Sequence, residues 1–223
     1  MEKETSVEGA GLMNLYQLYH KLYQQMGPQG WWPAESKWEI IWGAVLIQNT
    51  NWRNVAPALI LLKAATQFDP KRIIELDQEQ LIRLIRSCGF YKNKSACMLA
   101  VCRWLQTADY DLESLSHLQQ NELRRQLVSL KGIGNETADA LLLYVFDKPC
   151  FIADTYARRL FTALGCEMPR GYLPFQHLIE ARLQLKLEDY QEFHALIDEF
   201  GKIYCRNASA WQKGFLFGEK LEL

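Results

Sequence analysis

The residues whose types and spacing most directly suggest chemistry lie in a short segment, residues 127–140, that contains Gly132-Ile133-Gly134. One amphipathic helix is expected to end before this turn, and another begins directly after it. Gly132 and Gly134 permit backbone angles that other residues avoid, and they leave no side chain in the way of a close approach. The amides of such a turn point outward beside a helix N-terminus, where they form a seat for a phosphate. The segment is therefore predicted to hold a DNA backbone without reading its sequence.

The same turn has a plainer interpretation, in which glycine caps the first helix and connects it to the second. A bare Gly-x-Gly favours that alternative, whereas the full pattern Leu-x-x-Leu-x-Gly-Ile-Gly-x-x-Thr-Ala favours DNA binding. Ile133 is expected to fill the gap between the two helices. Lys131 is a candidate phosphate contact, and Asn135 is expected to cap the second helix at the DNA-binding turn.

Helical signals dominate the elements that must position this turn. Ser36 and Asp77 stand where N-caps belong, and Asp154 precedes a further helical stretch. Helices are expected over residues 40–47, 77–88, 94–105, 121–130, 136–146, 154–164, 175–187 and 190–204. Only residues 150–153 are expected to be extended, and one short segment cannot form a sheet. The prediction is an all-α chain of roughly ten helices.

Composition narrows the partners without identifying them. The chain has 223 residues and a formal net charge of −1, so a DNA-binding surface must come from local patches. No apolar run is long enough to cross a bilayer, and Met1–Gly11 lacks the apolar core of a signal peptide. The six cysteines show neither a Cys-x-x-Cys pair nor zinc-ligand spacing. They are expected to be reduced thiols in the core of a cytoplasmic protein that has no membrane contact.

Further segments along the chain extend the pattern in a fixed order. These are residues 43–50, 89–96 (Gly-Phe-Tyr-Lys-Asn-Lys-Ser-Ala) and 151–156 (Phe-Ile-Ala-Asp-Thr-Tyr). With the hairpin they resemble the endonuclease III superfamily of helix-hairpin-helix DNA glycosylases, from roughly residue 31 to 205. Residues 31–33, 48–52 and 193–200 are most similar to the 3-methyladenine DNA glycosylase III branch. The resemblance implies two helical lobes, residues 36–146 and residues 1–35 plus 147–223, with a cleft between them for DNA and a flipped base.

The resemblance places the catalytic carboxylate at Asp154. Breaking a glycosidic bond develops positive charge on the sugar, which a carboxylate stabilises, or the carboxylate activates the attacking water. The alternative is that Asp154 only caps the helix that follows it. Both roles are compatible.

A base pocket is expected at Trp31, Trp32, Pro33 and Trp52. An enzyme that acts on a base must flip it from the duplex and hold it against aromatic faces. An alkylated purine such as 3-methyladenine is cationic, so indole faces attract it more than a normal base. The alternative is core packing, which is the interpretation adopted for Trp38 and Trp42 because of their helical spacing.

Gln48 and Asn49 match the position at which the family inserts a polar side chain into the gap left by the flipped base. Local capping between two helices is the alternative for both. Arg158 and Arg159, beside Asp154, are candidate phosphate contacts, although exposed arginines are usually solvated surface.

Two departures from the family pattern bear on activity. Bifunctional members carry a lysine nucleophile where this chain has Glu136, and a carboxylate cannot form the Schiff base that leads to strand cleavage. Many members hold an iron–sulfur cluster with four C-terminal cysteines, whereas only Cys205 follows Cys166 here. The expectation is a monomeric, monofunctional glycosylase without a cofactor, acting on damaged DNA. A monovalent cation bound by the hairpin carbonyls is compatible with the family.

The preferred function is removal of alkylated purines. Two alternatives remain open: a glycosylase for a deaminated or mismatched base, and a helix-hairpin-helix DNA-binding module without catalytic activity.

Overall fold

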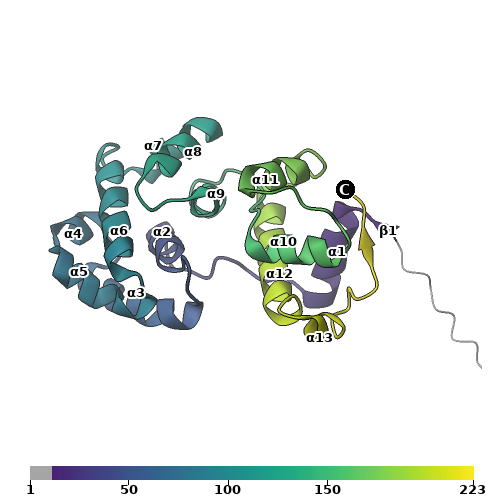
Figure 1. Cartoon of the computed structure of the whole chain (residues 1–223). Coiled ribbons are helices and arrows are strands. Elements are labelled where there is room, and N and C mark those ends of the chain that lie inside the picture. The colour runs from purple at the N-terminus through teal and green to yellow at the C-terminus, as the bar shows by residue number, and fades with distance from the viewer. Residues whose placement is uncertain (1–11) are drawn as a thin grey trace, which may run out of the picture. The chain divides into compact units, whose positions relative to one another are not determined.

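The computed structural model describes residues 12–223, which form two compact units (Figure 1). The hairpin unit is Trp32–Cys150, and the terminal unit combines residues 12–31 with Phe151–Leu223. The prediction about Met1–Gly11 lies outside the described residues. Within residues 12–223, the structure contains no helix that is both long and apolar enough to cross a membrane.

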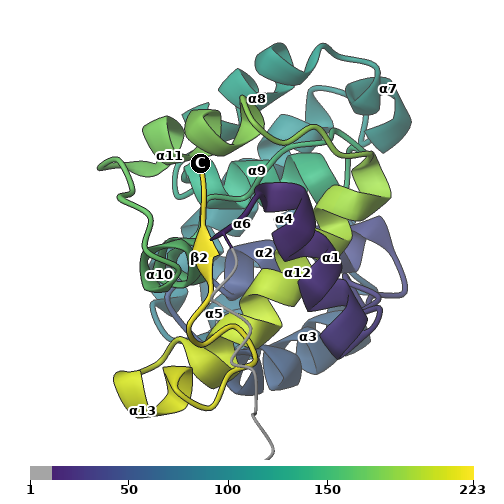
Figure 2. The same cartoon turned by 90° about the vertical axis from the view of Figure 1, so that its right-hand side faces the viewer.

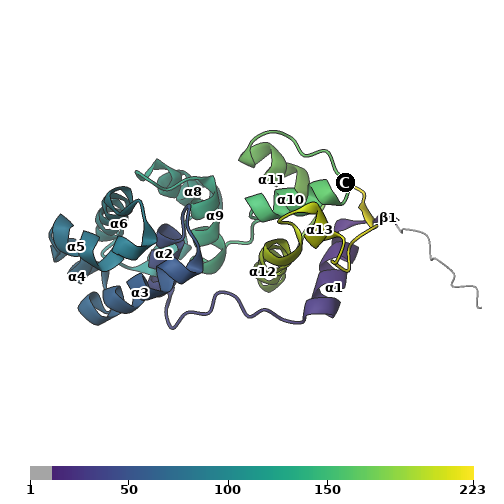
Figure 3. The ribbon, with the colours of Figure 1, turned by 60° about the horizontal axis from the view of Figure 1, so that its bottom comes forward.

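The hairpin unit is built around α2, a helix whose residues from Ile40 to Leu46 are all buried. Its helices are α2 (Lys37–Leu46), α3 (Trp52–Thr66), α4 (Pro70–Glu75), α5 (Gln78–Ile85), η1 (Arg86–Cys88), α6 (Tyr91–Gln106), α7 (Leu112–Ser116), α8 (Gln120–Ser129) and α9 (Asn135–Tyr144). Helix α2 packs against α3, α6 and α9, as Figure 3 shows. The predicted N-caps Ser36 and Asp77 both accept hydrogen bonds from backbone amides. Trp42 is fully buried and donates its indole N–H to the Phe68 carbonyl, which confirms it as core.

The terminal unit is organised by the long helix α12. Its elements are β1 (Leu12–Met13), α1 (Leu15–Met26), α10 (Thr155–Ala163), α11 (Tyr172–Glu180), α12 (Leu187–Tyr204), α13 (Ala208–Trp211) and β2 (Lys220–Leu221). Helix α1 lies beside α12, as Figure 2 shows. Helix α10 approaches α12 closely because Gly201 has no side chain: a Cβ there would lie 2.9 Å from the Cβ of Tyr156. The two short strands pair in parallel, with Leu12 opposite Lys220.

The all-α prediction is confirmed, but the predicted helices omit α1 and α3, and several boundaries need correction. The helix expected over residues 175–187 is α11, which begins at Tyr172 because Pro174 is tolerated in a first helical turn. The next helix begins at Leu187 rather than Tyr190. Gly134, not Asn135, is the N-cap of α9. The sequence predicted no paired strands, but the structure contains one pair, β1–β2, of two residues each.

Candidate functional site

The turn between α8 and α9 requires glycine at one position, not at two. Gly132 has a φ of +92°, and a Cβ there would lie 2.9 Å from the Cβ of Cys97. Gly134 has a φ of −90°, which any residue adopts, and no atom lies within 4 Å of a Cβ built there. The expectation that both glycines supply unusual backbone angles is therefore wrong for Gly134. What Gly134 provides is open space beside the start of α9.

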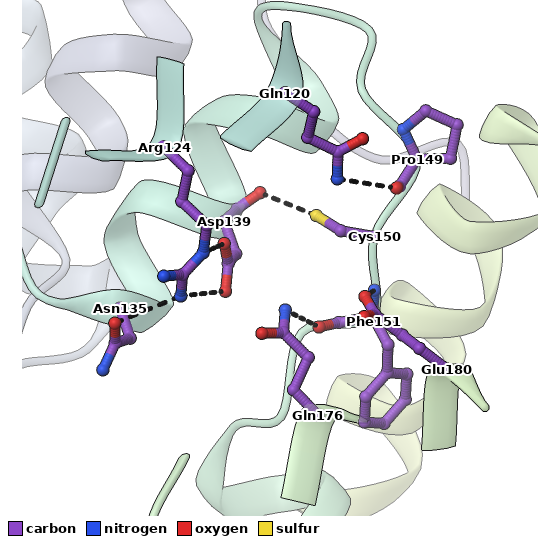
Figure 4. Close-up of polar contacts among 9 residues, drawn as sticks. All are labelled: Gln120, Arg124, Asn135, Asp139, Pro149, Cys150, Phe151, Gln176 and Glu180. Carbon is purple, nitrogen blue, oxygen red and sulfur yellow. Dashed lines mark hydrogen bonds and ion pairs between the residues drawn. The ribbon is translucent and has the colours of Figure 1, made fainter. Parts of the chain in front are cut away.

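The first turn of α9 has no side-chain cap. Asn135, which was expected to provide one, is the first helical residue, and its side-chain oxygen accepts a hydrogen bond from Arg124. Arg124 also forms a two-bond ion pair with the buried carboxylate of Asp139, with N–O distances of 2.7 and 3.1 Å (Figure 4). Ile133 is buried, as expected for a residue that fills the gap between the helices. The amides at the start of α9 thus form an uncapped helix N-terminus, which attracts anions.

Gln48 ties the turn after α2 to the hairpin. Its side-chain amide donates to the carbonyl oxygen of Gly132 and to the hydroxyl of Thr137, each at 3.0 Å. Both acceptors belong to the distant hairpin, so the amide does not cap a neighbouring helix, and the DNA-facing role of Gln48 stays a prediction. Its neighbour Asn49 is exposed and has a left-handed backbone, with a φ of +53°.

Lys94 is a positioning residue that the sequence analysis did not select. It is only 3% exposed, and its ammonium donates to the carbonyls of Leu46, at 2.9 Å, and Cys88, at 2.7 Å. Burial lowers the pKa of Lys94. The sequence signal that could have identified Lys94 was its place in the segment 89–96, which carries part of the family resemblance. In the structure this lysine is buried in α6.

These bonds join three segments of the hairpin unit into one group, the three-turn edge (residues 46–51, 88–90 and 131–134). Phe90 is on this edge, 65% exposed and with a φ of +45°, which is unusual for a bulky side chain. Lys131 is also exposed there. Phe68 has a similar backbone angle but is buried in the core, so it is the exposure of the Phe90 ring that makes it a candidate for contact with DNA.

Two of the four predicted pocket residues meet in the hairpin unit. The rings of Trp32 and Trp52 are 6.1 Å apart, and Trp32 also contacts Tyr144 at 5.5 Å. Gly43 makes room for the Trp32 indole, since a Cβ there would lie 3.3 Å from it. Trp52 remains 41% exposed. Tyr144 was missed because the apolar end of α9 resembled ordinary core in the sequence.

Trp31 belongs to the terminal unit, where it contacts α12. Its ring meets His194 edge-on at 5.7 Å, and the ammonium of Lys202 lies 5.0 Å from the ring centre. Lys202 also pairs with Asp198 and Glu199. Pro33 is exposed in the segment before α2.

Asp154 is 8% exposed and caps α10, as the alternative interpretation of this residue predicts. One carboxylate oxygen accepts a hydrogen bond from the Ala157 amide at 2.7 Å. This bond fixes the orientation of the carboxylate at the start of the helix. The catalytic role of Asp154 stays a prediction at this point.

The two arginines beside Asp154 differ in whether their guanidinium groups are already bonded within the protein. Arg158 donates to the carbonyls of Pro169 and Gly171, both at 2.7 Å, and lies over the Phe175 ring. Those guanidinium nitrogens are already used to hold the loop before α11. Arg159 is exposed and lies 5.9 Å from the ring centre of Tyr156.

The cysteines do not fit a four-thiolate cluster. Cys205 alone follows Cys166, and the remaining cysteines belong to the hairpin unit, where all of them are buried. Burial raises the pKa of Cys97 and Cys102 to about 12, so these thiols stay protonated at neutral pH. No group of three or more His, Cys, Asp or Glu among residues 12–223 is arranged to hold a metal ion. At the hairpin, the Gly132 carbonyl already accepts from Gln48, and a cation there stays a prediction.

Comparison with known proteins supplies the family context. Residues 42–183 match the model of the HhH-GPD superfamily, described as base excision DNA repair proteins. A relative in Methanocaldococcus jannaschii, named provisionally as a DNA repair glycosylase, is 36% identical over 86% of this chain and 89% of its own length. Endonuclease III of Sulfolobus acidocaldarius is 27% identical over 75% of this chain and 73% of its own.

Among solved structures, the fold is similar to the 3-methyladenine DNA glycosylase of H. pylori bound to 1,N6-ethenoadenine. The TM-score is 0.73 and the identity 26%, over 85% of this chain and 98% of that one. A trapped endonuclease III–DNA complex has a TM-score of 0.72 at 20% identity, over 88% and 90% of the two chains, and supports the fold alone.

Proposed function

The chain belongs to the HhH-GPD superfamily of base excision DNA repair proteins, and we propose that it is a monofunctional DNA glycosylase that removes alkylated purines. It acts on damaged DNA as a cytoplasmic monomer without a cofactor, and it leaves an abasic site. The favoured substrate is 3-methyladenine.

Asp154 carries this proposal. Its carboxylate is buried and held by the Ala157 amide at the start of α10, in the segment that follows the hairpin. A carboxylate oriented in this way stabilises the positive charge that develops on the sugar as the base departs. Water adds to the sugar C1′ and releases one proton to solvent, the C1′–N bond breaks, and the bond electrons leave with the base. A cationic purine leaves as a neutral base, so its departure needs little help from an acid.

The aromatic side chains support an alkylated purine as the substrate. Trp52 is partly exposed beside Trp32, and an indole face attracts a cationic base. The H. pylori glycosylase, which resembles this chain in structure, is named for 3-methyladenine and binds a modified adenine. We assign the same class of base to this chain.

The proposal of a monofunctional enzyme rests on Glu136. It is exposed in the first turn of α9, where bifunctional relatives carry a lysine, and its carboxylate cannot form a Schiff base with the sugar. Because several curated relatives are named endonuclease III, strand nicking is the competing outcome to measure.

The test is base release from methylated duplex DNA by the purified protein, with the released bases identified and strand nicking followed on the same samples. Release of 3-methyladenine without nicking is expected. Nicking at the abasic site would refute the monofunctional assignment, and release of a deaminated or mismatched base instead would refute the substrate. DNA binding without release of any base would leave a non-catalytic DNA-binding protein as the function.

A further inference from the structure

The backbone N–H and C=O of Phe151 are held by two side chains of α11. The side-chain amide of Gln176 donates to the Phe151 carbonyl at 2.8 Å, and the Phe151 amide donates to the carboxylate of Glu180 at 2.9 Å (Figure 4). Gln176 and Glu180 are one helical turn apart, so both face the backbone of the same residue. They satisfy the N–H and the C=O of one residue, as a neighbouring strand would.

This pairing matters because residues 151–154 are buried without forming a helix or a strand. Buried backbone groups need hydrogen-bond partners, and a segment outside regular structure must find them elsewhere. Gln176 is itself only 4% exposed, so its bond to Phe151 is shielded from water. The Phe151 ring is fixed as well, by edge contact with Phe175 and stacking on Phe161.

The short segment from Phe151 to Asp154 is therefore anchored at both ends. At its start, Gln176 and Glu180 hold the Phe151 peptide; at its end, the Asp154 carboxylate is bonded to the Ala157 amide. Only Ile152 and Ala153 lie between the two anchors, and both are buried, so they leave little room to absorb a displacement at the first anchor. In close packing, a shift of the peptide is transmitted to the carboxylate rather than dissipated.

We propose that Gln176 and Glu180 are positioning residues that set the location of the Asp154 carboxylate for glycosidic bond hydrolysis. The inference rests on the proposed function and extends it to α11, whose side chains touch neither the substrate nor the reacting atoms in this role. A displacement of about 1 Å costs an enzyme on the order of a hundredfold in rate. The two side chains are therefore expected to act on kcat rather than on DNA affinity.

The first experiment compares variants that keep the side-chain shape. Gln176→Met has a similar length and no charge but cannot donate to the Phe151 carbonyl; kcat for base release is expected to fall by roughly 10- to 100-fold with KM and DNA affinity unchanged. Glu180→Gln keeps an oxygen that accepts from the Phe151 amide, and it should retain most of the activity, whereas Glu180→Ala should not. Gln184→Met is the matched control, because that amide donates to the Glu180 carbonyl at the exposed end of α11 and does not contact Phe151.

A double-mutant cycle separates positioning from general structural damage. If Gln176 acts through Asp154, adding Gln176→Met to Asp154→Asn should not slow the residual reaction further. Multiplicative losses in the double variant would overturn the proposal. So would a Gln176→Met variant that loses DNA binding together with activity, since that pattern indicates a purely structural role.

Hydrogen exchange of the Phe151 amide gives a readout that does not depend on activity. Glu180→Ala should accelerate exchange at this amide while the amides of α12 stay protected. Unchanged exchange would refute the anchoring of Phe151. If the wild-type chain releases no base, the proposed function fails and the positioning role falls with it; normal wild-type release with an unaffected kcat in Gln176→Met overturns this inference alone.

Discussion

The side-chain amide of Gln48 donates a hydrogen bond to the carbonyl oxygen of Gly132, at 3.0 Å, and a second one to Thr137. Through this contact, the turn after α2 stabilises the hairpin. We expect Gln48→Ala to lower stability by about 1 kcal/mol, because water replaces a partly exposed bond. DNA affinity should fall severalfold more than in Gln106→Ala, a control at the exposed end of α6. Titration of labelled duplex DNA and urea denaturation measure the two effects, and an unaltered affinity would separate Gln48 from the DNA-binding turn.

The two hairpin glycines should respond differently to the same substitution. Gly132→Ala forces a Cβ to within 2.9 Å of Cys97 at a φ of +92°, so a loss of stability of about 1–3 kcal/mol is expected. Gly134→Ala meets no atom and no unfavourable angle, and the variant should fold normally. If Gly134 keeps space for a phosphate, DNA affinity should nevertheless fall. Wild-type affinity in Gly134→Ala would contradict that role, and thermal denaturation of both variants checks the stability difference.

The sequence predicted correctly those features that depend on residues close together in the chain. The hairpin follows from two glycines between amphipathic segments, and the caps Ser36, Asp77 and Asp154 act on amides within a few residues of themselves. Asn135 is the exception among the predicted caps. Arg124, from the preceding helix, binds its side-chain oxygen, and Gly134 takes the N-cap position instead.

What could not be predicted depends on contacts between distant parts of the chain. Lys94 is bonded to the Leu46 carbonyl, and nothing near Lys94 in the sequence indicates that partner. The same holds for the contact of Trp32 with Tyr144 and for the bonds from α11 to Phe151. Helix α3 was also missed: Pro57 lies inside it, beyond the first turn, where proline cannot donate the usual backbone hydrogen bond, and this weakens the sequence signal.

Two substitutions of Asp154 should separate its proposed role in catalysis from its role as the N-cap of α10. Asparagine is as good an N-cap as aspartate, so Asp154→Asn should keep the stability of α10 while base release falls by about 100- to 1000-fold to a slow residual rate and DNA binding persists. Asp154→Ala removes the bond to the Ala157 amide as well and should lower the free energy of unfolding by about 1 kcal/mol. Single-turnover base release, DNA titration and denaturation distinguish the three effects. Normal release by Asp154→Asn would show that the residue only caps the helix.

The lowered pKa of His194 predicts how the free energy of unfolding depends on pH. Burial, with a smaller contribution from the Lys202 charge, lowers its pKa to about 3. Between that value and the ordinary pKa of about 6.5, the unfolded chain binds a proton that the folded chain does not, so stability is full above this window and falls as the pH decreases through it. The neighbouring Asp198 acts in the opposite direction, because burial raises its pKa and the resulting stability is lost as the pH rises.

The comparison that isolates His194 is wild type against His194→Phe, which keeps an aromatic ring beside Trp31. Urea denaturation at neutral pH and at about pH 5 should show a smaller loss of stability in the variant, because the linked proton is gone. Equal losses in the two proteins would assign the acid sensitivity to other groups.

Trp52 should discriminate between charged and neutral bases. Its indole is 41% exposed beside Trp32, so Trp52→Ala removes a face that attracts a cation by about 0.5–2 kcal/mol and creates little cavity. Excision of cationic 3-methyladenine should therefore slow by roughly 3- to 30-fold more than excision of a neutral modified purine. Trp52→Phe retains an aromatic face, so its rate of excision of the cationic base should lie between those of the wild type and Trp52→Ala. The measurement is kcat/KM for each base in the same duplex sequence; an equal loss for both bases would mean that Trp52 shapes the site without sensing charge, and the preference for alkylated purines would have to come from another residue.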